Sequence, residues 1–333
     1  MDIATHALAS YALARGVFPR PRWPVIVGMV FAGTIADIDL LSIFFGPSVY
    51  FAARRTYTHS IVGTIVVILL AILPTRLLTK EAGEKIQALI LPLFLAAAFH
   101  VALDVFQSEG VALLWPARAG RLALDWLPPI DPWILFLLLA GILFPELLRL
   151  VSSEIGAKNK APRGRNGAIV TLGLIALYVV GRALLHSGSV AALEPHSYQG
   201  ESARRVGAFP DSFSIFTWHG VIETESRMCI AEVPGGPGRN FDPENVECVN
   251  KPEPSPELKA AQNSRVAQEY LRVVPFPRAS VAKTEDGYEV VIRSMRDVTE
   301  SEIRHRVAAQ IFLDSKPAVV NQELVWTRRV RLR

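Results

Sequence analysis

Two ionisable side chains lie near the end of a long apolar run, in the segment FHVALDVFQSEG at residues 99–110. His100 and Asp104 are four residues apart, so a helix places them on the same face, one turn from each other. An imidazole and a carboxylate in this arrangement can hold one metal ion. An ionisable residue inside a membrane span costs about 2.5 to 3.5 kcal/mol on insertion scales, so the pair is a candidate functional site.

Four more ionisable residues lie in or beside apolar runs: His6, Asp37, Asp39 and His59. Asp37 and Asp39 are two residues apart and cannot both point to one side of a regular helix. We therefore expect a helix end or an irregular turn in GTIADIDLLS, which a membrane tolerates where the backbone lines a polar cavity. If residues 3–14 fold back through the proline-rich turn RGVFPRPRWP, His6 approaches the level of Asp37.

Each of these residues taken singly also has a structural interpretation, because a histidine in an apolar helix is often a core residue and an aspartate often caps a helix. Six of them at a common depth favour one shared site. A proton or ion pathway is the main rival, but the chain lacks the paired halves of a transporter. Three imidazoles and three carboxylates suffice for one or two divalent metal ions, with zinc as the first choice and manganese or iron as alternatives.

Long apolar helices are the elements that must position these residues. Five segments are apolar and long enough, or nearly so, to cross about 30 Å of hydrocarbon. A shorter apolar helix at residues 3–14 precedes them and cannot span alone. The five predicted spans are residues 24–45, 60–78, 86–106, 131–150 and 168–185.

Apolar residues make up 50% of the 333-residue chain, but the long apolar runs all lie before about residue 187. The expected fold class is a multi-pass α-helical membrane domain at residues 1–187, followed by a small β-rich α+β soluble domain at 188–333. The net charge of +4 does not indicate a nucleic-acid partner, because the basic residues lie in short connections rather than in one patch. Asp2 stands where a signal peptide has basic residues, so no cleaved signal is expected.

The basic residues predict the topology, since the side of the membrane richer in Lys and Arg faces the cytoplasm. With an odd number of spans, the N-terminal loop is then cytoplasmic and residues 188–333 are extracytoplasmic. On the predicted cytoplasmic side are Arg15, Arg20, Arg22, Arg76, Lys80, Lys85, Arg149, Lys158, Lys160, Arg163 and Arg165, and on the other side are Arg54, Arg55, Arg118 and Arg121.

Residues 188–333 have the texture of a soluble domain. β-Branched and aromatic residues predict strands, and one helix is expected within residues 256–274. Cys229 and Cys248 are the only cysteines, and they either form a disulfide across the glycine-rich loop between them or remain two thiols. The strands are predicted within residues 212–224, 226–233, 287–295, 307–314 and 318–326.

The polar residues of the apolar runs, in their order, resemble the motifs of the YdjM-like family of bacterial inner-membrane metal-dependent hydrolases. The family pattern is an N-terminal TH, a P-D-x-D-like segment, an R-x-x-T-H-S element, an H-x-x-x-D and a G-x-x-L-L-W-P stretch. The resemblance covers roughly residues 1–150 and implies hydrolase activity at the bacterial inner membrane, without indicating the substrate. The matching positions are Thr5-His6, Ala36 to Asp39, Arg55 to Ser60, His100 to Asp104 and Gly110 to Pro116.

The expected function is a membrane-embedded metal-dependent hydrolase, in which the metal makes water a nucleophile. Asp39 is a further ligand or the general base, and Arg55 either holds a phosphate or carboxylate or anchors the chain at the membrane interface. A site at the outer leaflet favours a lipid or lipid-linked ester or phosphoester. The alternative is a non-catalytic membrane scaffold or sensor with a structural metal and a partner-binding tail, and the oligomeric state is left open. The predicted metal ligands are His6, Asp37, His59, His100 and Asp104.

Overall fold

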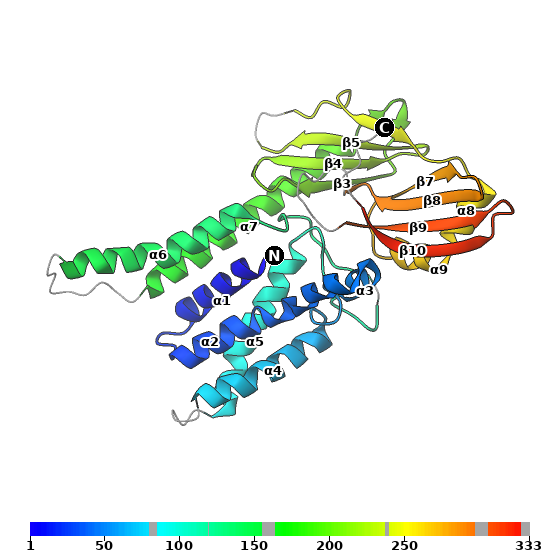
Figure 1. Ribbon diagram of the computed structural model, residues 1–333. Helices are drawn as coiled ribbons and strands as arrows, with labels where there is room; N and C mark the ends of the chain where they lie inside the picture. Colours follow the sequence, from blue (N-terminus) through cyan, green and yellow to red (C-terminus); the bar gives the residue numbers. More distant parts are fainter. Residues whose placement is uncertain (80–84, 119, 155–163, 237–239, 297–305, 328–333) are drawn as a thin grey trace. The chain divides into compact units, whose positions relative to one another are not determined.

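A computed structural model describes residues 1–79, 85–118, 120–154, 164–236, 240–296 and 306–327. Packing contacts divide the chain into two compact units, which are Met1–Leu40 with Arg55–Ala183, and Leu41–Arg54 with Leu184–Arg333. The first unit is helical, and the second contains both four-stranded sheets (Figure 1).

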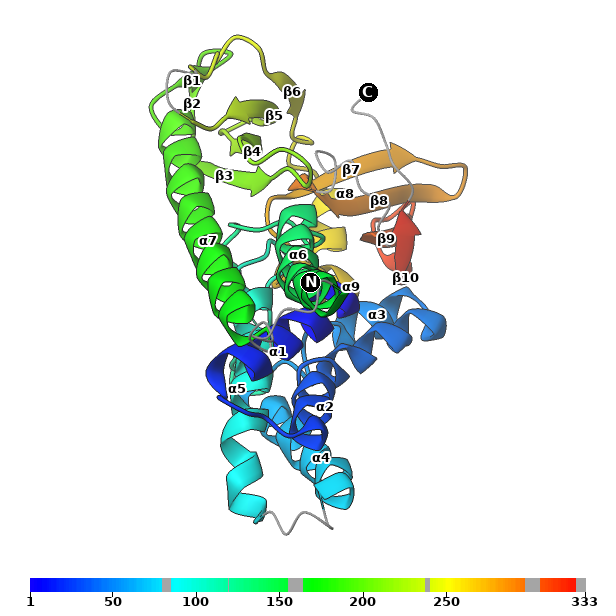
Figure 2. The ribbon, with the colours of Figure 1, turned by 90° about the vertical axis from the view of Figure 1, so that its left-hand side faces the viewer.

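The first unit consists of packed apolar helices, and Figure 2 shows α2, α4 and α5 side by side. Asp2 caps the start of α1, because its carboxylate accepts a hydrogen bond from the Thr5 backbone N–H at 2.9 Å. α1 and α2 approach closely, since a Cβ atom on Gly33 would lie 1.9 Å from Ser10 Oγ. The helices are α1 (Ile3–Val17), α2 (Trp23–Ala32), the 3-10 helix η1 (Ile35–Phe45), α4 (Ile61–Thr79), α5 (Ile86–Val105), α6 (Pro132–Glu154) and α7 (Arg165–Leu193).

Four helical segments among the described residues are long and apolar enough to cross a membrane: Trp23–Phe45, Ile61–Leu78, Ile86–Val105 and Arg165–Leu193. Pro132–Leu148, in the fourth predicted span, is a shorter apolar helix, so the count of five spans stays a prediction. Large apolar side chains face outward along these helices, as Leu69, Leu73 and Leu77 do at successive turns of α4. Such a surface suits a hydrocarbon environment.

The predicted irregularity at Asp37 and Asp39 is confirmed. α2 ends at Ala32, and the chain continues as η1 rather than as an α-helix. A 3-10 helix has about three residues per turn. Asp37 and Asp39 are both buried, with 2% and 8% of their surface exposed.

The helix of the fifth predicted span is longer than expected: α7 continues to Leu193, whereas the sequence predicts an end at residue 185. The polar sequence His186-Ser187-Gly188-Ser189 does not end the helix. Ser189 Oγ donates a hydrogen bond to the Leu185 carbonyl at 2.9 Å, one turn earlier. Leu193 is fully buried with Tyr198 and Trp218 in the core of the second unit, so tertiary packing extends the helix.

Asp131 caps the start of α6. Asp131 Oδ1 accepts hydrogen bonds from the Trp133 and Ile134 backbone N–H groups at 3.0 and 3.1 Å. Asp131 Oδ2 accepts a hydrogen bond from the Tyr178 hydroxyl of α7 at 3.0 Å, which ties α6 to α7.

The second unit contains two antiparallel four-stranded sheets, with strand orders β3-β4-β5-β6 and β10-β9-β8-β7, and a small β1–β2 pair. The predicted strands appear as β4, β5, β8, β9 and β10, whereas β1, β2, β3, β6 and β7 were not predicted. β3 contains Gly207, and a Cβ atom there would lie 2.7 Å from the Phe276 ring, so packing explains a residue that weakens the strand pattern. The strands are β1 (Ser197–Tyr198), β2 (Glu201–Ser202), β3 (Arg205–Pro210), β4 (Thr217–Glu223), β5 (Arg227–Pro234), β6 (Glu247–Asn250), β7 (Pro277–Lys283), β8 (Gly287–Ser294), β9 (Arg306–Asp314) and β10 (Val319–Thr327).

The helix predicted within residues 256–274 is two short helices, α8 (Pro256–Gln262) and α9 (Arg265–Leu271). The break occurs because Ser264 adopts an extended conformation and caps α9, accepting a hydrogen bond from the Ala267 backbone N–H at 3.3 Å. Leu258 of α8 and Tyr270 of α9 pack with buried residues of β8 and β9 in one hydrophobic cluster.

A segment far from the tail in sequence also belongs to the second unit. α3 (Pro47–Ala53) packs against β10, and the rings of Tyr50 and Trp326 lie 5.2 Å apart. The rings of Phe51 and Tyr270 are stacked at 5.4 Å. The sequence patterns do not indicate this long-range packing.

The two cysteines form a disulfide. Cys229 of β5 and Cys248 of β6 are directly opposite each other in the sheet and are covalently joined. Of the two alternatives left open by the sequence, the structure contains the bonded pair.

Replacing both cysteines with serine should lower the free energy of unfolding of the second unit by about 3 kcal/mol, because the bond closes a loop between residues 19 positions apart. Pulse proteolysis of the full chain in detergent, across a urea series, measures this change. Reductant should shift the wild-type midpoint to that of the double variant and leave the variant unchanged. Equal midpoints for the oxidised wild type and the variant would contradict the prediction.

Candidate metal centre

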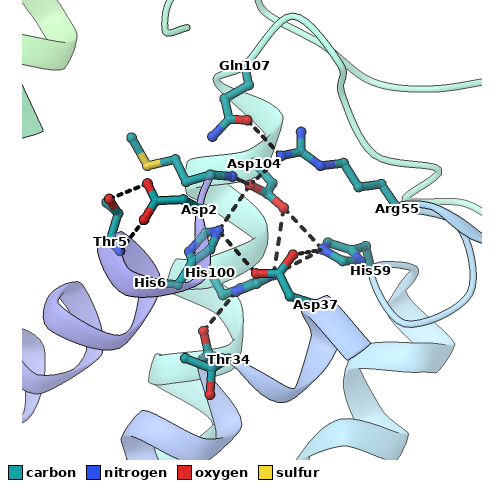
Figure 3. A network of polar contacts seen from close by, with 12 residues as sticks. Asp2, Thr5, His6, Thr34, Asp37, Arg55, His59, His100, Asp104 and Gln107 are labelled. Carbon is teal, nitrogen blue, oxygen red and sulfur yellow. Dashed lines mark hydrogen bonds and ion pairs between the residues drawn. The ribbon is translucent and has the colours of Figure 1, made fainter. Parts of the chain in front are cut away.

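Four buried residues of the first unit bring potential metal-ligand atoms together. They are Asp37 of η1, His59 in the turn before α4, and His100 and Asp104 of α5. One ligand atom from each residue lies within 4.8 Å of all the others. Figure 3 shows the side chains converging from these three segments.

The closest approach involves both imidazoles and one carboxylate oxygen. His59 Nε2 lies 3.0 Å from His100 Nε2 and 3.1 Å from Asp104 Oδ2. His100 Nε2 lies 3.7 Å from the same Asp104 oxygen. Asp37 Oδ1 is 3.9 Å from His59 Nε2. Two nitrogen atoms and two carboxylates therefore face a common point, as in a divalent metal site with mixed ligands.

The Nδ1 atoms of the two imidazoles have hydrogen-bond partners of their own. His100 Nδ1 lies 2.8 Å from the Gly33 carbonyl oxygen, which only accepts, so Nδ1 carries the proton. His59 Nδ1 lies 3.2 Å from Asp39 Oδ2 and 2.9 Å from Thr58 Oγ1, and His59 Nε2 lies 3.1 Å from Asp104 Oδ2, so each ring nitrogen of His59 has a carboxylate oxygen as a partner. When the His59 proton lies on Nδ1, the two Nε2 atoms present lone pairs to each other at 3.0 Å, an arrangement that a shared cation stabilises.

Asp39 lies on the far side of His59 from the other three residues of the group. Its Oδ2 atom accepts hydrogen bonds from the Arg55 backbone N–H at 2.7 Å and the Thr58 hydroxyl at 3.3 Å, in addition to its contact with His59. In metalloproteins a carboxylate in this position orients the ligand histidine.

His6 lies against the group of four. Its Nε2 atom is 3.2 Å from Asp104 Oδ1 and 3.9 Å from Asp37 Oδ2. Its ring is 3.8 Å from the His100 ring, measured between centroids. The fold-back of α1 onto α2 therefore brings His6 to the level of Asp37, as the sequence predicts. The two oxygens of Asp104 face different partners, with Oδ2 toward His59 and Oδ1 toward His6.

Arg55 is buried beside Asp104 rather than exposed at an interface, with 1% of its surface accessible. Its Nη2 atom lies 3.3 Å from Asp104 Oδ1 and donates a hydrogen bond to Gln107 Oε1 at 2.8 Å. Its Nε atom lies 3.3 Å from Glu109 Oε2. The Met1 nitrogen also contacts Asp104 Oδ1.

Gln107 was missed by reasoning from the sequence. It is fully buried and lies two residues after the end of α5. The spacing of His100, Asp104 and Gln107 is i, i+4, i+7, which continues one helix face and could have indicated it. An uncharged residue at the end of an apolar run costs less free energy in a membrane than a carboxylate does, so the sequence gives less reason to single it out.

The turn that presents His59 packs tightly against the start of α4. Ser60 Oγ donates a hydrogen bond to the Tyr57 carbonyl at 2.9 Å and accepts one from the Gly63 backbone N–H at 3.0 Å. A Cβ atom on Gly63 would lie 1.8 Å from the Tyr57 carbonyl oxygen and 2.9 Å from the Thr58 Cα atom. Only glycine allows the backbone to approach this closely.

Comparison with known proteins identifies one family. The family model described as YdjM inner membrane protein matches residues 1–188, which is more than half of the chain. No curated protein and no solved structure matches the chain.

Substituting Gly63 with alanine should displace the Tyr57–Thr58 backbone and move His59 away from His100 and Asp104. We expect metal affinity to fall about tenfold or more, as for other changes around metal ligands, although Gly63 is not a ligand. Titration with Zn²⁺ in competition with a chromophoric chelator measures the affinity. Gly173→Ala on α7 is the matched control, because a Cβ atom there meets nothing within 4 Å. Equal affinities in both variants would contradict the prediction.

Proposed function

We propose that this chain, which belongs to the YdjM inner membrane protein family, is a membrane-embedded metal-dependent hydrolase of an ester or phosphoester. The buried group of Asp37, His59, His100 and Asp104 carries the proposal. Carboxylates removed from water are strongly disfavoured unless they are paired or bind a cation. The facing Nε2 atoms add lone pairs directed at the same point.

The proposed ion is divalent, with zinc as the first choice for mixed imidazole and carboxylate ligands and manganese or iron as alternatives. One ion suits the group of four. If a second ion binds, His6 would be a further ligand, because its Nε2 atom lies 3.2 Å from Asp104 Oδ1.

A bound divalent ion supplies a Lewis acid that makes water a nucleophile near neutral pH. In the proposed hydrolysis the water oxygen bonds to the acyl or phosphoryl centre and the ester bond breaks. The alcohol leaves with one proton from the water, and the acid retains the hydroxyl group. Asp39 acts as a positioning residue in this scheme, because its contact with His59 Nδ1 keeps Nε2 available to the ion.

The position of the four-residue group along the helices supports a substrate that belongs to the membrane. Asp37 follows α2, His59 precedes α4 and Asp104 lies at the end of α5, so the group forms where apolar helices end. A substrate whose reactive bond lies at the level of the lipid headgroups would meet such a site. We therefore propose a lipid or lipid-linked ester or phosphoester.

A structural metal site is the second candidate function. Structural zinc is usually bound by four protein ligands, whereas catalytic zinc keeps one position for water or substrate. The observation that favours this alternative is that four residues already converge. The chain would then be a membrane scaffold or sensor with a tail that binds a partner.

The proposed topology has the N-terminal loop in the cytoplasm and the second unit outside it. The disulfide supports this assignment, because structural disulfides persist in oxidising compartments. The excess of basic residues on the opposite side of the spans agrees with it. Lys80, Lys158, Lys160 and Arg163, which contribute to that excess, lie outside the described residues.

The purified wild type should bind one or two divalent ions per chain and hydrolyse a generic p-nitrophenyl ester or phosphodiester. The double variant His100→Ala, Asp104→Ala should lose both properties, because it removes an imidazole and the central carboxylate. Elemental analysis measures the metal content, and absorbance assays measure the hydrolysis. His219→Ala is the control, since His219 belongs to β4 of the second unit. Equal metal content in wild type and double variant would refute the proposal, and retained metal without hydrolysis would favour the structural alternative.

A reporter enzyme active only outside the cytoplasm, fused to the C-terminus, should be active because the second unit is proposed to be extracytoplasmic. A fusion after residue 82, in the connection between α4 and α5, should be inactive and serves as the control. Activity of the second fusion alone would reverse the proposed topology.

A further inference from the structure

Two buried hydrogen-bond donors beside the metal centre have no acceptor among the described residues. They are Nη1 of Arg55 and Nε2 of Gln107. The side chain of Arg55 is 1% exposed and Gln107 is fully buried. An unsatisfied buried donor costs about 1 to 3 kcal/mol, and more if it is charged, so two together indicate a bound acceptor.

The remaining contacts hold both groups in place. One hydrogen bond of 2.8 Å joins Arg55 Nη2 to Gln107 Oε1 and leaves Arg55 Nη1 and Gln107 Nε2 as donors that this bond does not use. Asp104 Oδ1 and Glu109 Oε2 hold the same guanidinium from other sides. Gln107 is anchored by its backbone, which forms a bridge with Leu127 and donates to the Asp104 carbonyl at 3.3 Å.

Arg55 and Gln107, the donor pair, lie next to the candidate metal ligands but on the other side of the Asp104 carboxylate from His59 and His100. Arg55 contacts Asp104 through Oδ1, whereas His59 and His100 approach Oδ2. Figure 3 shows Gln107 and Arg55 beyond Asp104, on the side away from Thr34. A ligand that satisfies both the ion and the donors must therefore present two acceptor oxygens.

We infer that Arg55 Nη1 and Gln107 Nε2 bind a non-bridging oxygen of a phosphoester whose other oxygen faces the metal, an inference that rests on the proposed function. A phosphoester carries at least two non-bridging oxygens that share negative charge on one phosphorus, and guanidinium groups bind such oxygens strongly. A carboxylic ester has one carbonyl oxygen, which cannot reach both positions. The donor pair thus selects a phosphoester over a carboxylic ester.

Binding of inorganic phosphate to the metal-loaded full chain in detergent tests the inference. Equilibrium dialysis with radiolabelled phosphate should detect binding to the wild type. Gln107→Glu should weaken it about tenfold or more, because it replaces a donor with a negative charge and keeps the acceptor for Arg55. Gln107→Leu, which removes the donor without adding charge, should weaken binding in the same direction. Gln268→Glu is the matched control, since Gln268 is exposed on α9 of the second unit.

Metal content is measured on every sample and separates the two hypotheses. Normal metal content in the Gln107 variants with weakened phosphate binding supports the inference. Metal-loaded wild type that does not bind phosphate, or binding that survives both Gln107 substitutions, overturns the inference and leaves the metal centre standing. A wild type that binds no metal overturns both. If Gln107→Glu loses metal and Gln107→Leu keeps it, phosphate binding by the Gln107→Leu variant decides the outcome.

Discussion

Burial of ionisable groups among apolar helices is the constraint on which the rest of the first unit depends. Around the candidate metal centre, three imidazoles and three carboxylates are buried together with the guanidinium of Arg55. Each charge removed from water is strongly disfavoured unless a partner compensates for it. Asp39 is compensated by a backbone N–H, a hydroxyl and an imidazole, and Arg55 lies against Asp104. The Met1 nitrogen also contacts Asp104, and the four residues around the two facing Nε2 atoms form a group that could hold a metal ion.

Breaks in regular helices supply the ligands. A continuous helix would turn Asp37 and Asp39 to different sides, and the change from α2 to η1 lets both be buried. The turn before α4 contains Arg55 with φ at 54°, a conformation that is uncommon for a residue other than glycine. Backbone irregularity at membrane depth is tolerated where it is enclosed by protein or lines a polar site. The irregular backbone brings the carboxylates into the buried site, and the polar surroundings of that site make the irregular backbone tolerable.

The connectivity between the two units also involves the metal centre. Residues Leu41–Arg54 belong to the second unit, where α3 packs with Trp326 and Tyr270. This segment begins two residues after Asp39 and ends directly before Arg55. The hydrogen bond from the Arg55 N–H to Asp39 Oδ2 closes it into a loop. The chain on either side of this segment therefore carries a residue that contacts the candidate site, which is Asp39 beside His59 and Arg55 beside Asp104.

The sequence by itself determined the apolar helices, the β-rich tail and the residues of the candidate site, because these signals are local. Apolar length reveals helices that can cross a membrane, and an ionisable residue within such a run is costly enough to be noticed. Local patterns could not decide which atoms face one another. Only the tertiary structure placed Asp39 behind His59, added Gln107, joined Cys229 to Cys248 and extended α7 to Leu193. Each of those outcomes depends on packing between residues distant in sequence, where contacts and not propensities determine which arrangement has the lower free energy.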